Sequence, residues 1–303
     1  MRETLGNWLS PVLPVHAMSG PLSSFAVRRL LPAAVLLGVL AAAGPALRAH
    51  GDDQALIDAL TEQLAKAPEA DLYIRRGELF RHQQQWEKAD ADFASAARLD
   101  PALTLVDFFR ARTQLEAGAP EKALPLVDRY LVGAPDEPEG RFLRGDVLAA
   151  LGRHDAGAQE YREGIQRAPS PRPEHYLRRA RFLAAAPAAE AARVIDALDE
   201  GLRRLGPVIA LVDYAISIEL ERKNYDGALH RIGQAMSHAP RRERWLARQG
   251  DILATSGRPT EAVAAYRAAL AAIEDLPERY RDTVPMEKLV IDVRAALARL
   301  SGQ

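Results

Sequence analysis

Arginine recurs at a regular interval and supplies the first candidate binding groups. Arg76, Arg110 and Arg144 are 34 residues apart (110 − 76 and 144 − 110), and Arg179 follows 35 residues later. A guanidinium group binds carboxylate or phosphate through two parallel hydrogen bonds. One interpretation of the interval is therefore a basic stripe that binds an acidic ligand.

The histidines form no recognisable catalytic or metal-binding motif. None of the seven stands in a His-Glu-x-x-His run or in a tight cluster with carboxylates. His50 is the exception to weigh, because cleavage after Ala49 would leave its imidazole beside a free α-amine, a chelating pair suited to copper. An accessory metal-binding or enzymatic protein that uses His50 therefore stays open as an alternative function.

Motifs for other kinds of catalysis are missing from the sequence. There is no Gly-rich phosphate loop, Gly-x-Ser-x-Gly elbow or Ser/His/Asp arrangement. The chain has no cysteine, which excludes disulfides, thiolate catalysis and Cys-ligated zinc. Its net charge of −1 gives no basic field for nucleic acid. We therefore predict a non-catalytic protein with no cofactor, no metal and no nucleic-acid partner.

Helices are the elements that must position the charged side chains. Ala, Leu, Glu and Arg dominate the composition, and all four favour helices. No alternating strand pattern occurs. Pro101, Pro135 and Pro169 also fall 34 residues apart, and a proline ends a helix because it lacks an N–H and clashes with the preceding turn. The sequence predicts an all-α protein built from a repeating unit.

Residues 70–103 carry the clearest copy of that unit. Its small, aromatic and proline positions resemble the tetratricopeptide repeat (TPR), in which two antiparallel helices recur about every 34 residues. Further copies start near Thr104, Pro138, Pro173, Ile209 and Glu243, and the second helix of the fourth is displaced by about two residues. The residues that carry the repeat pattern are Gly77, Ala89, Phe93, Ala96, Pro101, Gly145, Tyr161, Pro169, Ala228, Pro240, Gly250, Ala262 and Tyr266.

The resemblance implies a right-handed superhelical solenoid of about six helix pairs over residues 70–277. Residues 50–69 are expected to form an N-terminal capping helix that starts at about Asp53 and buries Leu56, Leu60 and Leu64. Residues 278–303 are expected to form a C-terminal capping helix from Pro285 onward. The apolar stripe of this last helix runs through Met286, Leu289, Val290, Val293, Leu297 and Leu300. A dimerisation helix is the alternative for this stripe, because one apolar face fits either partner.

The resemblance also gives a second interpretation of the arginines. TPR proteins with an Arg-Gly pair in the first helix tend to carry an acid just before the aromatic residue of the second helix. Asp92 precedes Phe93, and Glu160 precedes Tyr161. We therefore predict internal ion pairs Arg76–Asp92 and Arg144–Glu160. Arg110 and Arg179 have no clear matching acid.

TPR proteins bind their ligands on the concave groove lined by first helices, and the resemblance implies such a groove here. We expect it to bind another protein or a peptide through an exposed apolar row rimmed by charge. The alternatives are that the helix at 53–65 folds back over Phe108 and Phe142, or that the chain is a structural assembly subunit. The predicted groove residues are Ile74, Glu78, Phe108, Arg112, Phe142, Asp146, Leu177 and Arg181.

Residues 1–49 have the pattern of a secretory signal peptide with an upstream extension. Arg28 and Arg29 precede an apolar run from Leu30 to Leu47, and the run ends in small residues. Ala46 and Ala49 are both candidate cleavage sites, and Met18 is a candidate start. The expectation is a periplasmic or secreted protein with no membrane span after cleavage. An uncleaved membrane anchor and a buried helix are the alternatives.

Overall fold

The computed structural model describes residues 44–187 and 189–301, and these are α-helical with short connections and no strand. The chain divides into two compact units, residues 1–52 and 53–303, and the repeats belong to the second. The predicted all-α solenoid is confirmed. Its first and second helices alternate as α3 (Ala70–His82), α4 (Trp86–Leu99), α5 (Leu105–Glu116), α6 (Pro120–Gly133), α7 (Pro138–Ala150), α8 (His154–Arg167), α9 (Pro173–Ala185), α10 (Ala191–Leu205), α11 (Ile209–Glu221), α12 (Tyr225–His238), α13 (Glu243–Thr255) and α14 (Pro259–Glu274).

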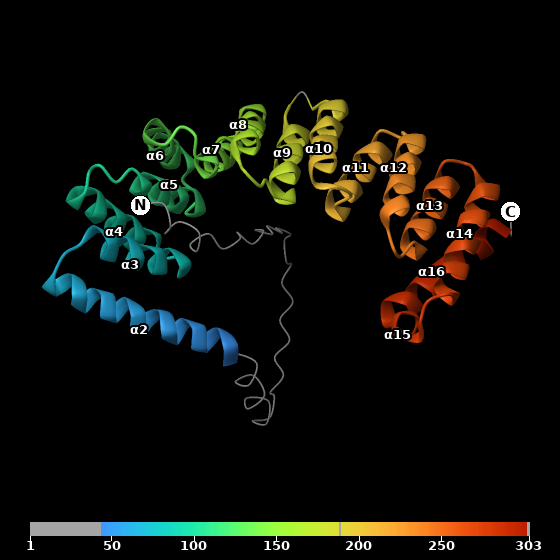
Figure 1. The fold of residues 1–303 in the computed structure, drawn as a ribbon, viewed down its shortest axis with the longest axis horizontal. Coiled ribbons are helices and arrows are strands. Elements are labelled where there is room, and N and C mark those ends of the chain that lie inside the picture. The colour runs from blue at the N-terminus through green and yellow to red at the C-terminus, as the bar shows by residue number, and fades with distance from the viewer. Residues whose placement is uncertain (1–43, 188, 302–303) are drawn as a thin grey trace, which may run out of the picture. The chain divides into compact units, whose positions relative to one another are not determined.

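Each helix from α3 to α14 packs against its neighbours in the chain, so the pairs follow one another in a row (Figure 1). First helices of successive pairs also meet: α3 contacts α5, α5 contacts α7, and α9 contacts α11. Among the described helices, second helices make no comparable contact with one another. The surface on which the first helices meet is called the first-helix face here, and it carries the predicted groove residues.

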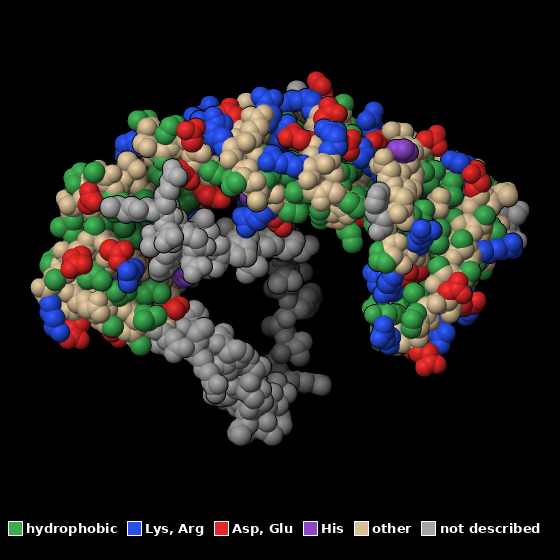
Figure 2. Space-filling model, in the orientation of Figure 1, with side chains coloured by type: hydrophobic (Ala, Val, Ile, Leu, Met, Phe, Trp, Pro, Cys, Tyr) green, Lys and Arg blue, Asp and Glu red, His purple; other side chains and the backbone are tan. Residues whose placement is uncertain are grey.

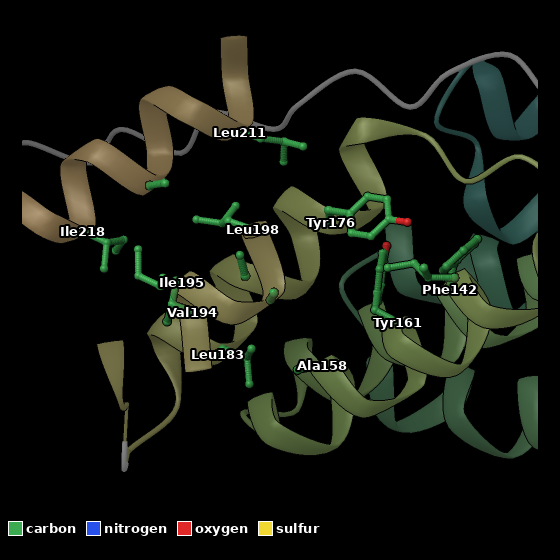
Figure 3. Packing of buried hydrophobic residues seen from close by; sticks show 14 of the residues in the cluster. Phe142, Ala158, Tyr161, Tyr176, Leu183, Val194, Ile195, Leu198, Leu211 and Ile218 are labelled. Atoms are coloured by element: carbon green, nitrogen blue, oxygen red, sulfur yellow. The ribbon is translucent and has the colours of Figure 1, made fainter. Parts of the chain in front are cut away.

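Small residues let the two helices of a pair approach closely. A Cβ on Gly77 would lie 2.7 Å from Cε1 of Phe93, and one on Gly250 would lie 2.5 Å from Cδ1 of Tyr266. Phe93 and Ala89 have no exposed surface. The largest core cluster runs from the third repeat into the fifth. The ring of Tyr176, in the fourth repeat, is fully buried in this cluster (Figure 3).

The fourth repeat departs from the others at its internal connection. Residues 186–190 join α9 to α10, whereas three residues suffice elsewhere, for example 83–85 between α3 and α4. The middle residue of each three-residue turn has positive φ, as in Gln84 (φ 59°) and Gly152 (φ 74°). The longer connection accounts for the predicted two-residue displacement of the second helix (5 − 3).

The helix before the repeats differs from the expectation. Helix α2 spans Gly44–Lys66, so it runs through the expected start at Asp53. Ile57 and Leu64 are buried, but Leu56 is 53% exposed, so the expected stripe is wrong at one position. Thr61 Oγ1 accepts a 2.9 Å hydrogen bond from Arg76, which ties α2 to α3.

The last repeat is followed by α15 (Glu278–Arg281) and α16 (Val284–Ser301). Helix α16 packs on α14 and α13 and buries Met286, Val293 and Ala296. Residues of the expected stripe therefore pack against the sixth repeat of the same chain.

The predicted signal segment lies mostly outside the described residues, which begin at Gly44. Candidate cleavage sites Ala46 and Ala49 fall within α2. None of the described helices combines the length and apolar character needed to cross a membrane.

Candidate binding face

The recurring arginines are paired inside the protein. Arg76 makes two hydrogen bonds of 2.7 Å to the carboxylate of Asp92, whose side chain is buried. Arg144 pairs with Glu160 and also donates to Asp128 at 2.7 Å. Both predicted pairs are confirmed.

The two arginines without an assigned acid also have partners. Arg110 donates to Asp90 of the preceding repeat at 2.8 Å, and Arg179 pairs with Glu200 at 2.5 Å. All four guanidinium groups are thus engaged, and the interpretation as a basic stripe for an acidic ligand is wrong. The sequence reasoning missed these acids because they stand 20 residues before and 21 after their arginines, instead of 16 after.

Phe108 and Phe142 correct the predicted groove. They are only 7% and 5% exposed, so they do not form an open apolar row. The Phe108 ring lies 5.2 Å from that of Tyr130, and the Phe142 ring lies 5.0 Å from Tyr161 and 4.0 Å from His175.

The reason for this burial lies in the repeats themselves and not in α2. A Cβ on Gly164 would lie 2.5 Å from Cε1 of Phe142, so the glycine opens a space on α8 that the ring fills. Ile74 and Leu177, at the same repeat position, are half-buried and pack on the core.

The charged row of the first-helix face is largely neutralised by neighbouring helices. Glu78 pairs with Arg112 of α5 and with Arg81, and Arg81 also pairs with Glu116 at 2.7 Å. Burial raises the pKa of Glu78, but the two guanidinium groups outweigh it and the pKa is lowered overall.

Asp146 occupies the same position in the third repeat. It accepts a 2.9 Å hydrogen bond from the Tyr161 hydroxyl and lies 3.3 Å from Arg178 of α9. Partial burial raises the pKa of Asp146 to about 6, although Arg178 and the hydroxyl both oppose the shift.

Arg181 is the member of this row that keeps an open charge. Its side chain is exposed on α9, and the described residues give it no ion-pair partner. It lies within electrostatic reach of the half-buried Tyr214 of α11, whose pKa is raised by burial and lowered in part by Arg181. Leu177 stands one turn before Arg181 and is also half-buried. We call Leu177, Arg181 and Tyr214 the Arg181 patch.

Tyr214 was missed by the sequence reasoning, which followed the fifth and ninth positions of each repeat. The available signal was an aromatic residue at the sixth position, as at Phe109 in the second repeat. Other charges of both signs are interspersed over the visible surface, and no one-signed field forms there (Figure 2).

Metal-ligating side chains do not gather within the described residues: no group of three or more His, Asp or Glu is placed to hold an ion. The His50 side chain is not among those described. The copper hypothesis therefore stays a hypothesis from the sequence.

Family models decide the relationship that the repeat geometry indicates. Residues 110–171 match a tetratricopeptide repeat model, and residues 209–287 match a model of a tetratricopeptide repeat-like domain. The chain is a tetratricopeptide repeat protein. No curated protein matches it.

Solved structures of low sequence identity are similar to this TPR protein. One is the C-terminal part of a TPR protein from Cytophaga hutchinsonii, 12% identical, with a TM-score of 0.52 over 76% of this chain and 96% of that one. Another is a TPR protein from Parabacteroides merdae, 15% identical, with a TM-score of 0.49 over 81% of this chain and 93% of that one.

Proposed function

We propose that this TPR protein is a non-catalytic scaffold that binds a segment of another protein across the first-helix face. TPR folds commonly act as protein-interaction scaffolds. The observation that carries the proposal is the Arg181 patch, where an unpaired guanidinium lies within electrostatic reach of a half-buried aromatic ring on that face.

The patch has the composition of an interaction centre. Arginine and tyrosine are enriched among residues that dominate binding energy, because they combine a large apolar surface with directed hydrogen bonds. The other charges at this repeat position already have partners, as Glu78 has in Arg112. The exposed Arg181 guanidinium is free to pair with a ligand, and a carboxylate next to an apolar side chain would suit it best.

We also propose that the protein acts outside the cytoplasm, in the periplasm or as a secreted protein. The support is the sequence pattern of Arg28-Arg29, an apolar run and a small-residue end. The alternative is an uncleaved anchor, which would tether the chain to the membrane.

Peptide selection tests the binding proposal. The full chain is used to select ligands from a displayed library of random peptides, and their affinities are measured by calorimetry. Arg181→Glu and Tyr214→Ala should each weaken selected peptides at least tenfold, about 1.4 kcal/mol.

Arg162→Glu is the matched control, because Arg162 is exposed on the second helix α8 and has no ion pair within the described residues. It should leave affinity unchanged. No enriched peptide, or peptides that ignore both patch variants, would reject the proposal.

A further inference from the structure

Helix α16 has a second apolar face that the repeats do not cover. The outer face of a terminal element in a solenoid is normally polar, because it meets water. Here Val284 is 78% exposed and Ile291 67% exposed, although α16 already buries Met286 and Val293 on its other side.

The exposed residues form one stripe. At 100° per residue, Val284, Ile291, Ala295 and Ala298 fall within an arc of about 60°. Ala295 and Ala298 are exposed as well, and their small side chains permit another helix to approach closely. The stripe is narrower than the apolar face of a core helix and is closer to the seam of a coiled coil.

A hollow of about 450 Å³ adjoins the stripe between α14, α15 and α16. Leu270, Ile273, Val290 and Ile291 are its apolar lining residues, and the remaining lining residues are charged: Glu274, Arg281, Asp282, Glu287 and Arg294. A projecting apolar residue and an apolar hollow thus share one surface.

The charges along the stripe are self-complementary under a twofold rotation. Ile291 lies midway between Val284 and Ala298. In an antiparallel pair of α16 helices, Val284 of one copy would therefore face Ala298 of the other, and the two Ile291 residues would face each other. A twofold axis perpendicular to the two helices places each flank of one helix beside the same flank of the other helix. Glu287 then faces Arg294 of the partner on one flank. On the other flank Lys288 is paired with Asp292 of its own helix at 2.7 Å, so this flank meets its copy without an unpaired charge.

We propose that α16 binds the α16 of a second copy of this chain, antiparallel, with the twofold axis at Ile291. A foreign partner would need its own alternation of charge to match these flanks, whereas a second copy supplies it automatically. The proposal is independent of ligand binding at the Arg181 patch, which lies on α9 and α11.

Cysteine cross-linking tests the position of the axis. The chain has no native cysteine, so a single Ile291→Cys change in the full chain introduces one thiol per copy. Mild oxidation should convert most of this variant to a disulfide-linked dimer on a non-reducing gel. Val132→Cys, at an 86% exposed site on α6, is the control and should stay monomeric. Equal cross-linking of both variants, or of neither, would overturn the proposal.

Sedimentation velocity tests the chemistry of the contact. The full chain should dimerise with rising concentration, and Ile291→Glu should raise the dimer dissociation constant at least tenfold, because two carboxylates would meet at the axis. Glu287→Arg should weaken the dimer, and adding Arg294→Glu should restore it. A chain that stays monomeric at all concentrations, a dimer that tolerates Ile291→Glu, or a double variant no better than the single one would each overturn it.

Discussion

Arginine side chains in this protein bind its own acids, and the degree of burial decides what each pair contributes. The Arg76 and Asp92 side chains are largely buried, while the Arg75 and Asp71 side chains are mostly exposed, at 2.7 Å in both cases. Distance alone therefore does not separate the two pairs. Removing one partner leaves the other as an unpaired, unsolvated charge only where water cannot take the place of the missing partner.

Asp92→Ala tests that difference. It should lower the free energy of unfolding by about 3 kcal/mol, because Arg76 would keep a partly buried and unpaired charge. Asp71→Ala, the exposed counterpart, should cost no more than about 0.5 kcal/mol. Urea denaturation of both variants measures the effect, and equal losses would contradict the argument.

Asp146 predicts a pH dependence. Its pKa is raised to about 6 from an ordinary value of 3.8, so the folded state binds more protons than the unfolded state between those values. Stability from this group is full below about pH 4 and is lost as the pH rises to about 6.

Asp146→Asn removes this titration and should remain able to accept the Tyr161 hydrogen bond. The stability of the wild type relative to the variant should fall by about 2 kcal/mol from pH 4 to pH 7. The measurement is urea denaturation at several pH values. A constant difference would mean that Asp146 titrates normally.

Sequence reasoning at this scale succeeded where spacing determines contact and failed where neighbouring repeats decide it. Arg76–Asp92 lies within one helix pair, so its spacing could be predicted. Phe142 was predicted to be exposed because its position commonly faces ligands. The space that buries Phe142 exists because Gly164 has no side chain, and His175 of the next repeat supplies the ring that stacks on Phe142.

A glycine sets the distance between the two helices of a pair. A Cβ on Gly77 would come within 2.7 Å of Phe93, a fully buried ring with no room to retreat. The close approach of α3 and α4 therefore depends on the missing side chain.

Gly77→Leu should lower the free energy of unfolding by about 2–4 kcal/mol, because the added volume forces the two helices apart. His82→Ala, an exposed change on the same helix, should cost little. Thermal melts followed by circular dichroism give the comparison. Similar shifts for the two variants would contradict the packing described for α3 and α4.

Most helices could be predicted from repeat phase, because prolines such as Pro101 and turn glycines such as Gly152 recur at helix boundaries. The start of α2 could not, since it lies before the first repeat and no repeat pattern marks it; Pro45 stands in the first turn of α2, where a proline is tolerated. The stripe of α2 shifted from Leu56 to Ile57 for the same reason: no repeat pattern fixes its rotation.

At the scale of the whole molecule, the chain offers two separate surfaces, the Arg181 patch and the outer face of α16. The patch includes two residues of the predicted groove, Leu177 and Arg181. The α16 face could not be predicted, because its identification required knowing which stripe of the helix the sixth repeat covers.

Processing of the N-terminus can be checked directly. The pattern that follows Arg28-Arg29 predicts cleavage after Ala46 or Ala49. Mass spectrometry of protein exported by the native host should give an N-terminus between Ala46 and Asp52. A mature chain that retains Leu30 to Ala43 would favour the anchor.

The arginine pairs that cross from one repeat to the next have a consequence for folding cooperativity. Arg110 reaches Asp90, Arg144 reaches Asp128, and Arg81 reaches Glu116, each in a neighbouring repeat. In a linear array, stability is a sum of intrinsic repeat terms and nearest-neighbour coupling terms. These pairs place part of the free energy in the coupling, so one repeat cannot unfold without exposing unpaired charge on the next. Similar pairs join the later repeats, as Arg178 joins Asp146 and Arg231 joins Asp199. The repeats should consequently melt cooperatively, and salt that screens the pairs should broaden that transition.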